Sequence, residues 1–392
     1  MSAKSTTRTR TRTVSRPGDR LLVAAFLLMV TLPGVLTPTG IGRTDPSRNG
    51  EAISKPPTLT RAGGVGAWLR QASDWLRVSF ALRREMIGWD ARLKMSLALD
   101  TTYGSAVTLG REGWLFYLVH RGSQGVRPEM DFSPDELDRW VSFLEARQRR
   151  LAARGVAFLV VVAPNKETIY PDLLPAGTPA ARPRSRLDVL LGRLRERGRV
   201  EAVDLRPALR QAREPDSPFR SYPLYYRTDS HWNELGALLA TRQVLERLHA
   251  RFPGVEVPSD GALTLSREST GGGDLARMQG LQAQFSDSRV RVQVSGRRCS
   301  FDLGSVAPGQ SPEPPLFSEK TLECPGAPIP RALVLHDSMM IGMLPTLATA
   351  FQRSVWRLSD TLDASLLDRE KPDVVILEFV ERTLWRGAPS ST

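Results

Sequence analysis

Two continuous apolar runs rich in β-branched residues, at 156–162 and 374–379, are typical of strands buried on both faces of a parallel sheet. Shorter apolar runs predict further strands at 200–205 and 332–335. Elsewhere the apolar spacing is helical and predicts helices over 134–154, 187–197, 233–252 and 339–351. Strands that alternate with helices indicate an α/β fold, with a mostly parallel sheet that is covered on both faces.

The N-terminal part combines a basic segment with an apolar one. Residues 1–20 carry six basic side chains and one acidic side chain, and the run 21–36 that follows holds no charged residue. As a helix this run reaches about 24 Å, less than the roughly 30 Å hydrocarbon core of a bilayer. The flanking charges and the lack of a small-residue cleavage site predict a basic cytoplasmic tail over 1–20 and an uncleaved transmembrane signal-anchor over 21–37. A signal-peptide core and a buried helix are the alternatives.

The composition changes again after this segment. Residues 38–66 are rich in Pro, Gly, Ser and Thr and predict a flexible linker. Residues 67–100 place tryptophans and other apolar residues at helical spacing, which predicts an amphipathic helix that packs on the following domain, with membrane-surface binding as the alternative. The main domain is expected over 101–385. Within it, the Gly-, Pro- and Ser-rich stretch 256–331 predicts an irregular or β-rich insertion.

Net charge and cysteines narrow the class of protein. Of the net charge of +12, five units come from residues 1–20 and only +7 from the rest, so the charge does not indicate nucleic-acid binding.

Cys299 and Cys324 lie 25 residues apart in a chain expected to fold in an oxidising compartment. We therefore predict a disulfide, worth about 3 kcal/mol on the chain-entropy model, with two buried free thiols as the alternative.

The candidate chemistry follows the predicted strands, because ligands of open α/β sheets bind beyond the carboxyl ends of the strands. Ser338 follows the strand at 332–335 and precedes a helix, so its hydroxyl would lie beside free backbone N–H groups. Asp229 and His231 are two residues apart, and in an extended segment both side chains project to the same side. A serine with a histidine base and an orienting carboxylate predicts acyl transfer. Helix capping by Ser338 and by Asp229 is the structural alternative.

The chain has only four histidines, which limits the choice of base. His336 lies two residues before Ser338 and competes with His231 for this role. A metal site built from Asp229, His231, His336 and Asp337 has no supporting ligand spacing. We therefore expect neither a metal nor an organic cofactor.

Four motifs occur in the order GREGWLFY at 110–117, APNKETIYPD at 163–172, TDSHWN at 228–233 and Asp337-Ser338. Together they resemble the alginate O-acetyltransferase family (AlgJ/AlgX-like). The resemblance covers about 70–385 and implies an SGNH-hydrolase-like three-layer α/β fold with a rearranged strand order. By position, it implies catalytic roles for Asp229, His231 and Ser338.

Further candidates lie near the strand ends. For oxyanion binding these are the backbone N–H groups of Ser338, Met339 and Gly273. For substrate contact or support of the site they are Asn165, Lys166, Tyr170, His336 and Arg382. His336 stands where the family usually has glycine.

The resemblance implies a single-pass protein of the cell inner membrane with a periplasmic catalytic domain. It would transfer acetyl groups, through an acetyl-serine, to hydroxyls of an exported polysaccharide, alginate-like or other. The acetyl groups would come from a membrane-bound O-acyltransferase partner. The alternatives are a polysaccharide acetylesterase with the same three residues and a catalytically inactive polysaccharide-binding component of an export complex, the latter motivated by His336.

Overall fold

The computed structural model describes residues 17–37, 64–79, 81–96, 107–118, 132–175, 178, 184–296, 299 and 319–388. Most of the predicted basic tail 1–20 and of the predicted linker 38–66 lies outside these residues. The chain divides into two compact units, Met1–Trp89 and Asp90–Thr392, which are described separately.

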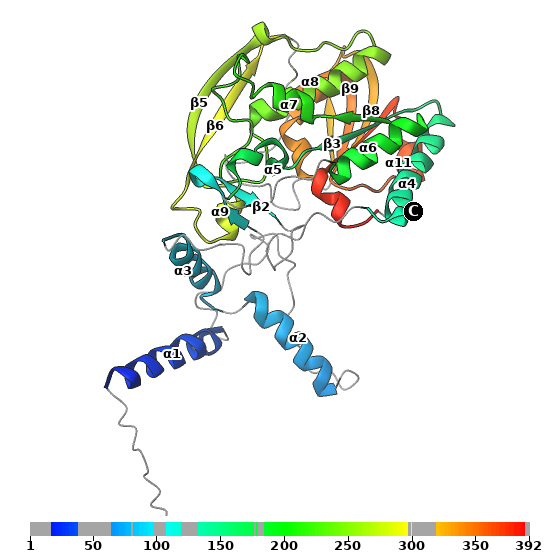
Figure 1. Ribbon diagram of the computed structural model, residues 1–392. Helices are drawn as coiled ribbons and strands as arrows, with labels where there is room; N and C mark the ends of the chain where they lie inside the picture. The colour runs from blue at the N-terminus through cyan, green and yellow to red at the C-terminus, as the bar shows by residue number, and fades with distance from the viewer. Residues whose placement is uncertain are drawn as a thin grey trace, which may run out of the picture. The chain divides into compact units, whose positions relative to one another are not determined.

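The N-terminal region is helical, with α1 (Pro17–Leu36), α2 (Gly64–Ser79) and α3 (Arg83–Ser96) (Figure 1). Two helices therefore stand where one amphipathic helix was predicted over 67–100. A turn separates them at 81–82, where Leu82 adopts a φ of 61°, a left-handed conformation that interrupts a helix. In the part of the chain that the structure describes, no helix is both long enough and apolar enough to span a membrane.

A six-stranded sheet forms the centre of the second unit, in the order β4-β3-β10-β8-β9-β7 (Figure 1). Its strands are β3 (Ala157–Ala163), β4 (Glu201–Asp204), β7 (Glu319–Glu323), β8 (Ile329–Leu335), β9 (Phe351–Arg357) and β10 (Val374–Val380). Neighbouring strands are parallel except β7 and β9, which pair antiparallel at the edge. The predicted α/β fold, with a mostly parallel sheet and a non-sequential strand order, is confirmed.

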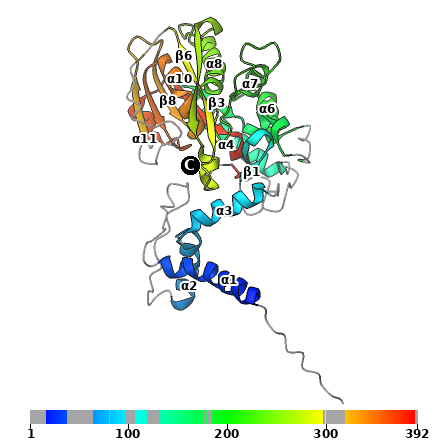
Figure 2. The ribbon, with the colours of Figure 1, turned by 90° about the vertical axis from the view of Figure 1, so that its left-hand side faces the viewer.

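Helices cover both faces of this sheet (Figure 2). One face packs against α4 (Pro134–Ala152), α6 (Arg186–Arg197) and α11 (Ala364–Glu370), and the other against α7 (Arg206–Gln211) and α8 (Glu234–Arg251). Successive side chains of β3 enter opposite cores, with Phe158 and Val160 on the α4 side and Leu159 and Val161 on the α8 side. Burial on both faces explains why this strand reads as a continuous apolar run.

Two antiparallel hairpins lie outside the central sheet. They are β1 (Val107–Leu109) with β2 (Leu115–Tyr117), and β5 (Leu263–Gly271) with β6 (Ser286–Val294). The short helix α9 (Asp274–Met278) lies between β5 and β6 in the chain. The predicted insertion over 256–331 is β-rich, but its boundary is too late, because β7 and the start of β8 belong to the central sheet.

The helix predicted over 339–351 is replaced by three short helical segments. These are η8 (Ser338–Gly342), α10 (Leu344–Leu347) and η9 (Ala348–Ala350). Pro345 lies in the first turn of α10, where its missing N–H and fixed φ allow a helix to start but not to continue from the preceding turn. The chain then enters β9 directly at Phe351.

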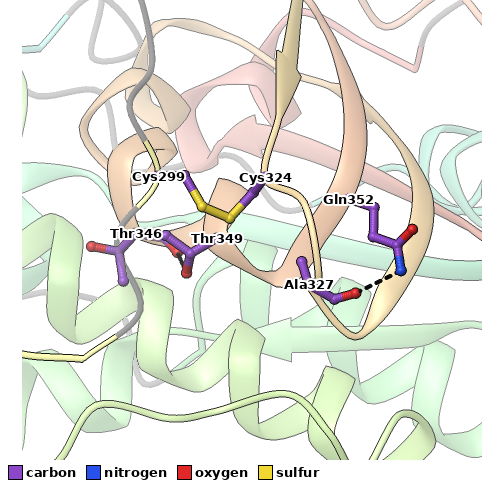
Figure 3. The surroundings of a disulfide bond; sticks show 6 residues. All are labelled: Cys299, Cys324, Ala327, Thr346, Thr349 and Gln352. Carbon is purple, nitrogen blue, oxygen red and sulfur yellow. Dashed lines mark hydrogen bonds between the residues drawn. A yellow bond between two sulfur atoms is a disulfide. The ribbon is translucent and has the colours of Figure 1, made fainter.

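Cys299 and Cys324 form the predicted disulfide (Figure 3). Their Cα atoms lie 5.4 Å apart, within the usual range for a disulfide. Cys324 directly follows β7 and is fully buried, and its N–H donates to the carbonyl of Gln352 on β9 at 2.9 Å. Gln352 in turn donates from Nε2 to the carbonyl of Ala327 at 2.9 Å. The bond therefore attaches Cys299 to the β7–β9 edge of the sheet.

Candidate active site

The structure brings Asp229, His231 and Ser338 together just beyond the carboxyl end of β8. His231 Nδ1 lies 2.7 Å from Asp229 Oδ1, and His231 Nε2 lies 2.8 Å from Ser338 Oγ. Because a carboxylate only accepts hydrogen bonds, Nδ1 carries the proton, and Nε2 is left to accept from the Ser338 hydroxyl. This is the order of hydrogen bonds that activates a serine as a nucleophile.

Neighbouring residues, and not Asp229 or Ser338, cap the adjacent helices. Asn233 caps α8, and its Oδ1 accepts from two N–H groups of the first turn at 3.0 and 3.1 Å. Asp337 caps η8 by accepting from the Met339 N–H at 2.8 Å. Since these two caps satisfy the starts of α8 and η8, the Ser338 hydroxyl and Asp229 Oδ1 are left to face the His231 ring.

Each member of the partly buried Asp229–His231 pair shifts the pKa of the other. Burial alone would raise the pKa of Asp229, but the charge and hydrogen bonds of His231 lower it below its usual range. Burial would likewise lower the pKa of His231, yet the Asp229 carboxylate outweighs this and raises it. A histidine with a raised pKa is a stronger base toward a serine proton.

Lys166 supports the loop that carries the base, residues 226–232, which is called the base loop below. It is only 3% exposed, and its Nζ donates to the carbonyls of Tyr226, Arg227 and Asp229 at 3.1, 3.1 and 2.7 Å. These bonds use all three N–H donors of the ammonium group. Burial lowers the pKa of Lys166 to about 8, although the charges of Asp229 and Asp274 favour the cation. Of the two predicted roles of Lys166, these contacts favour support of the site.

Two carboxylates that the sequence analysis did not assign also support the base loop. Asp274 accepts from the N–H and hydroxyl of Ser230 at 2.7 and 2.6 Å, and its own N–H donates to Asp229 Oδ2 at 2.8 Å. Asp287, on β6, accepts from the N–H and hydroxyl of Thr228, both at 2.7 Å. Both lie more than 40 residues beyond the loop, so no local pattern reveals them.

Gly273 lies directly against Asp229. A Cβ at this position would lie 2.4 Å from Asp229 Cβ and 2.6 Å from Asp229 Oδ2, so only glycine fits. The Gly273 N–H donates to the Thr228 hydroxyl at 2.9 Å. The predicted oxyanion role of this N–H is therefore not supported, because the donor is already used.

The nucleophile turn, defined as residues 336–339, contains the other predicted oxyanion donors. The Met339 N–H donates to Asp337 Oδ1 at 2.8 Å and is likewise occupied. Among the described residues, none accepts a hydrogen bond from the Ser338 N–H, which lies at the start of η8. Ser338 is thus the one of the three predicted donors whose N–H is available to an oxyanion.

One side chain joins the base loop to the nucleophile turn. Trp232 is 3% exposed, and its Nε1 donates to the Met339 carbonyl at 2.9 Å. Trp232 follows His231, and Met339 follows Ser338, so this bond sets the position of one half of the site against the other. The TDSHWN motif contains the tryptophan, but its partner could not be read from the sequence.

Asn165 and Tyr170 are structural neighbours of the site. Each is 5% exposed. The Asn165 N–H donates to Glu381 Oε2 at 3.0 Å, and the Tyr170 hydroxyl accepts from the Leu224 N–H at 2.8 Å. Of the two predicted roles, substrate contact and support, their burial favours support.

Arg382 differs from these two residues. It lies in η10 (Glu381–Trp385), its guanidinium lies 5.6 Å from the centroid of the Tyr117 ring, and its charge opposes protonation of His231. Arg382 thus lies close enough to affect the histidine, and its contact with a substrate stays a prediction.

His336 does not compete with His231 in this structure. It is 4% exposed, its Nδ1 lies 2.7 Å from the Asp337 carbonyl, and burial lowers its pKa. Its ring lines a cavity of about 220 Å³ that also borders Trp140 and Glu378 and does not include Ser338. The substitution for glycine therefore leaves the His231–Ser338 contact intact.

Asp229, His231 and Asp274 form the one group in the described part of the chain whose side chains could hold a metal ion. Their ligand atoms all lie within 4.8 Å of one another. The same atoms already form hydrogen bonds, since His231 Nδ1 faces Asp229 and Asp274 binds Ser230. A metal ion would have to replace these bonds, so the donor set fits the hydrogen-bonded arrangement better.

A three-layer α/β domain with a serine at a strand-to-helix turn and a paired histidine and aspartate defines the class of SGNH-hydrolase-like proteins. A family model described as "SGNH hydrolase-like domain, acetyltransferase AlgX" matches residues 107–320, just over half of the chain. The chain belongs to this family. The matched range includes Asp229 and His231 and ends before Ser338.

Similar proteins carry related names. The "Probable alginate O-acetylase AlgJ" of Pseudomonas aeruginosa is 30% identical over 208 residues, 52% of this chain and 49% of that protein. The protein of the same name from Pseudomonas syringae pv. tomato is 22% identical over 249 residues, 62% of this chain and 59% of that protein. The chain thus spans about half the length of the curated relatives that it matches.

One solved structure supports the fold, and a second gives a lower score. Bacillus cereus PatB1 superposes with a TM-score of 0.51 at 15% identity, covering 71% of this chain and 96% of that chain. The O-acetyltransferase domain of Pseudomonas putida AlgJ gives a TM-score of 0.46 at 20% identity, covering 73% and 94%. At such identities the likeness to PatB1 concerns the fold alone.

Proposed function

We propose that this protein is an O-acetyltransferase that works through an acetyl-serine on Ser338. The observation that carries the proposal is the 2.8 Å contact between His231 Nε2 and Ser338 Oγ, with Asp229 on the other ring nitrogen. Membership of a family described by an acetyltransferase domain supports acetyl as the transferred group.

The reaction has two half-reactions. Ser338 Oγ attacks the carbonyl carbon of an acetyl donor while its proton moves to His231 Nε2, and the Ser338 N–H binds the developing oxyanion. The donor's leaving group departs with the proton from His231, which leaves acetyl-serine. A sugar hydroxyl then attacks this ester, gives its proton to His231, and departs as the acetylated product while Ser338 Oγ recovers the proton. Asp229 stabilises the imidazolium in both steps.

The acceptor in this proposal is an exported polysaccharide, alginate-like or related. Its support is the name of the similar Pseudomonas proteins, which are called alginate O-acetylases. In this proposal the acetyl group is supplied by a membrane-bound O-acyltransferase partner, as the resemblance to the alginate O-acetyltransferase family implies.

The protein acts at the inner membrane with its catalytic domain in the periplasm, in this proposal. Residues 21–36 are uncharged and follow a basic segment. In α1 the side chains of Leu21, Phe26 and Val35 are 75%, 59% and 68% exposed, as suits a helix that meets an apolar partner. Cell fractionation with protease treatment of intact spheroplasts tests this: the domain should be membrane-bound and digested from outside. A domain protected from protease would contradict it.

Acetylation of a polymer in vitro tests the function. The purified protein is incubated with p-nitrophenyl acetate and de-acetylated alginate, and polymer acetyl groups are measured by NMR, with Ser338→Ala as the control. Polymer acetylation that depends on Ser338 is expected. Release of acetate without polymer acetylation would favour the esterase, and polymer binding with no acetyl turnover would favour an inactive binding component.

A further inference from the structure

Glu378 is a buried acid beside the nucleophile turn that the reaction above does not use. It lies on β10 between Leu377 and Phe379, which both enter the core on the α4 side, so strand alternation directs Glu378 to the other face. It is 2% exposed. An acid buried to this degree is costly unless it is neutral or paired, so its position calls for an explanation.

Glu378 is hydrogen-bonded to Asp337, the residue before the nucleophile. Glu378 Oε2 accepts from the Asp337 N–H at 3.0 Å. Asp337 Oδ1 accepts from the Met339 N–H and Asp337 Oδ2 from the Val380 N–H, both at 2.8 Å. Asp337 therefore links the ends of β8 and β10, and Ser338 stands between two of the backbone groups held in this way.

The surroundings of Glu378 favour its neutral form. Burial and the Asp337 charge both raise the pKa of Glu378 well above its usual range. Glu378 Oε1 has no donor facing it among the described residues. Because no donor in the described part of the chain faces Glu378 Oε1 and the Asp337 carboxylate is an acceptor, we expect Oε1 to keep its proton. The other titratable groups around Glu378 are Arg382 on η10, and His336 and Asp360 on the shared cavity.

We propose that Glu378 is a positioning residue of the nucleophile turn that acts as a neutral acid, accepting from the Asp337 N–H and donating its proton to the Asp337 carboxylate. Asp337 then remains the single anion, with both oxygens committed to backbone donors. An ionised Glu378 would place two carboxylates in contact in a buried site and displace the turn that orients Ser338. The proposal rests on Ser338 as the nucleophile of the proposed function.

Two substitutions separate this role from simple packing. Glu378→Gln keeps an acceptor for the Asp337 N–H and supplies N–H groups to the Asp337 carboxylate, so it copies the neutral acid. Glu378→Leu keeps the volume and removes both hydrogen bonds. Glu145→Gln is the matched control, because Glu145 is also buried, at 4% exposed, but lies on α4 among arginines.

The experiment combines NMR with the rate of Ser338 acetylation by p-nitrophenyl acetate, followed by mass spectrometry. In protein with ¹³C-labelled glutamate carboxyls, the resonance lost in Glu378→Gln is that of Glu378, and it should have the shift of a protonated acid at neutral pH. Glu378→Gln should acetylate at nearly the wild-type rate, as should Glu145→Gln. Glu378→Leu should be slower by up to about a hundredfold while melting as a folded protein.

An ionised Glu378 at neutral pH would overturn the proposal, as would a Glu378→Gln protein as slow as Glu378→Leu. If Glu378→Leu fails to fold, the NMR shift and the Glu378→Gln rate still decide. If the wild type forms no adduct on Ser338, the proposed function fails, while the carboxyl resonance still reports whether Glu378 is the neutral partner of Asp337.

Discussion

The base loop and the nucleophile turn differ in the charge of the groups that hold them. Under the base loop a buried cation, Lys166, donates to three backbone carbonyls, and the carboxylates of Asp274 and Asp287 accept from N–H groups of the same loop. At the nucleophile turn the support is acidic, because Asp337 accepts from two backbone N–H groups and Glu378 accepts from a third.

The difference follows from which backbone groups each segment leaves unpaired. The base loop is irregular and turns several carbonyls inward, so a buried donor with three N–H groups satisfies them. The nucleophile turn ends a strand and begins a helix, which leaves N–H groups without partners, so carboxyl oxygens satisfy them. The charged side chains that support the two segments are therefore explained mainly by the backbone groups that they bind, and not by a direct part in catalysis.

The largest expected effect comes from removing the contact between the two halves. Ser338→Ala and His231→Ala should each lower acetyl transfer from p-nitrophenyl acetate by about 10⁴-fold or more, because each removes the activated nucleophile. The double variant should be no slower than either single variant, since the two residues act as one unit. If the double variant instead loses rate by the product of the two single losses in steady-state kinetics, Ser338 and His231 do not act as one unit.

The two carboxylates near His231 should differ strongly. Asp229→Asn should lower the rate by about 10³- to 10⁴-fold, because the amide no longer fixes the histidine tautomer. Asp274→Asn should cost only about tenfold, because the Asp274 carboxylate binds Ser230 and lies farther from His231 Nδ1, at 3.7 Å, than Asp229 does, at 2.7 Å. Equal losses in the two variants would assign Asp274 a direct role beside the histidine.

Lys166→Met should damage the base loop and leave the nucleophile turn intact. It leaves three buried carbonyls without a donor, and each such loss costs about 1–3 kcal/mol. We expect a lower melting temperature and a slow Ser338 acetylation, with Trp232 fluorescence changed because this residue lies in the base loop. Lys166→Arg serves as the control that keeps the charge. If the Lys166→Met protein is as stable as the wild type, Lys166 does not support the base loop.

The pH profile should report both halves of the site. On the acid side, activity should fall below a midpoint that lies above the ordinary histidine value of 6.5, because His231 must be neutral to act as a base. On the alkaline side, activity should fall near pH 8, where Lys166 becomes an amine with two N–H groups for three carbonyls. Initial rates across this range, with Lys166→Arg for comparison, check both limbs.

Stability and activity should respond to alkaline pH with opposite signs. The pKa of Lys166 is lower in the folded chain, about 8, than its ordinary 10.5, so between these values the unfolded chain binds more protons. The Lys166 contribution to stability therefore rises with pH across this window while activity falls. The His231 contribution behaves conversely: it is complete below the ordinary pKa and is lost as pH rises through the raised one. Urea unfolding at several pH values measures how the free energy of unfolding changes with pH, separately from the rate of acetylation.

The smallest effect on activity is expected from the disulfide, which contacts neither half of the site. Replacing Cys299 and Cys324 by serine should lower the free energy of unfolding by about 3 kcal/mol and leave the acetylation rate unchanged. Wild-type protein with and without reductant gives the same comparison without mutation. A large loss of rate at unchanged melting temperature would link this edge of the sheet to the site.

The sequence predicted those parts of the fold and site that depend on local patterns. The strands at β3 and β10 were evident because burial on both faces makes them continuous apolar runs. The placement of Asp229, His231 and Ser338 was predictable because strand ends and scarce histidines narrow the choice. Strand β9 was missed, since its polar Gln352, Arg353 and Arg357 hide the apolar pattern.

What could not be predicted depends on contacts between distant segments. The N–H group of Gly273 was expected to be free, but the Thr228 hydroxyl, 45 residues away, accepts its hydrogen bond. The sequence left substrate contact and support of the site open for Lys166, because the carbonyls that it binds lie some 60 residues away. Pairings over such distances follow from the folded topology and leave no local signature.

The central claim is that Ser338, activated by His231, accepts the acetyl group. Mass spectrometry of peptides from protein quenched during turnover of p-nitrophenyl acetate tests it most directly. We predict an added acetyl group on the peptide that contains Ser338, accumulating in wild type and absent from His231→Ala. An acetyl group on another residue, or none on Ser338 while acetyl transfer proceeds, would contradict the account.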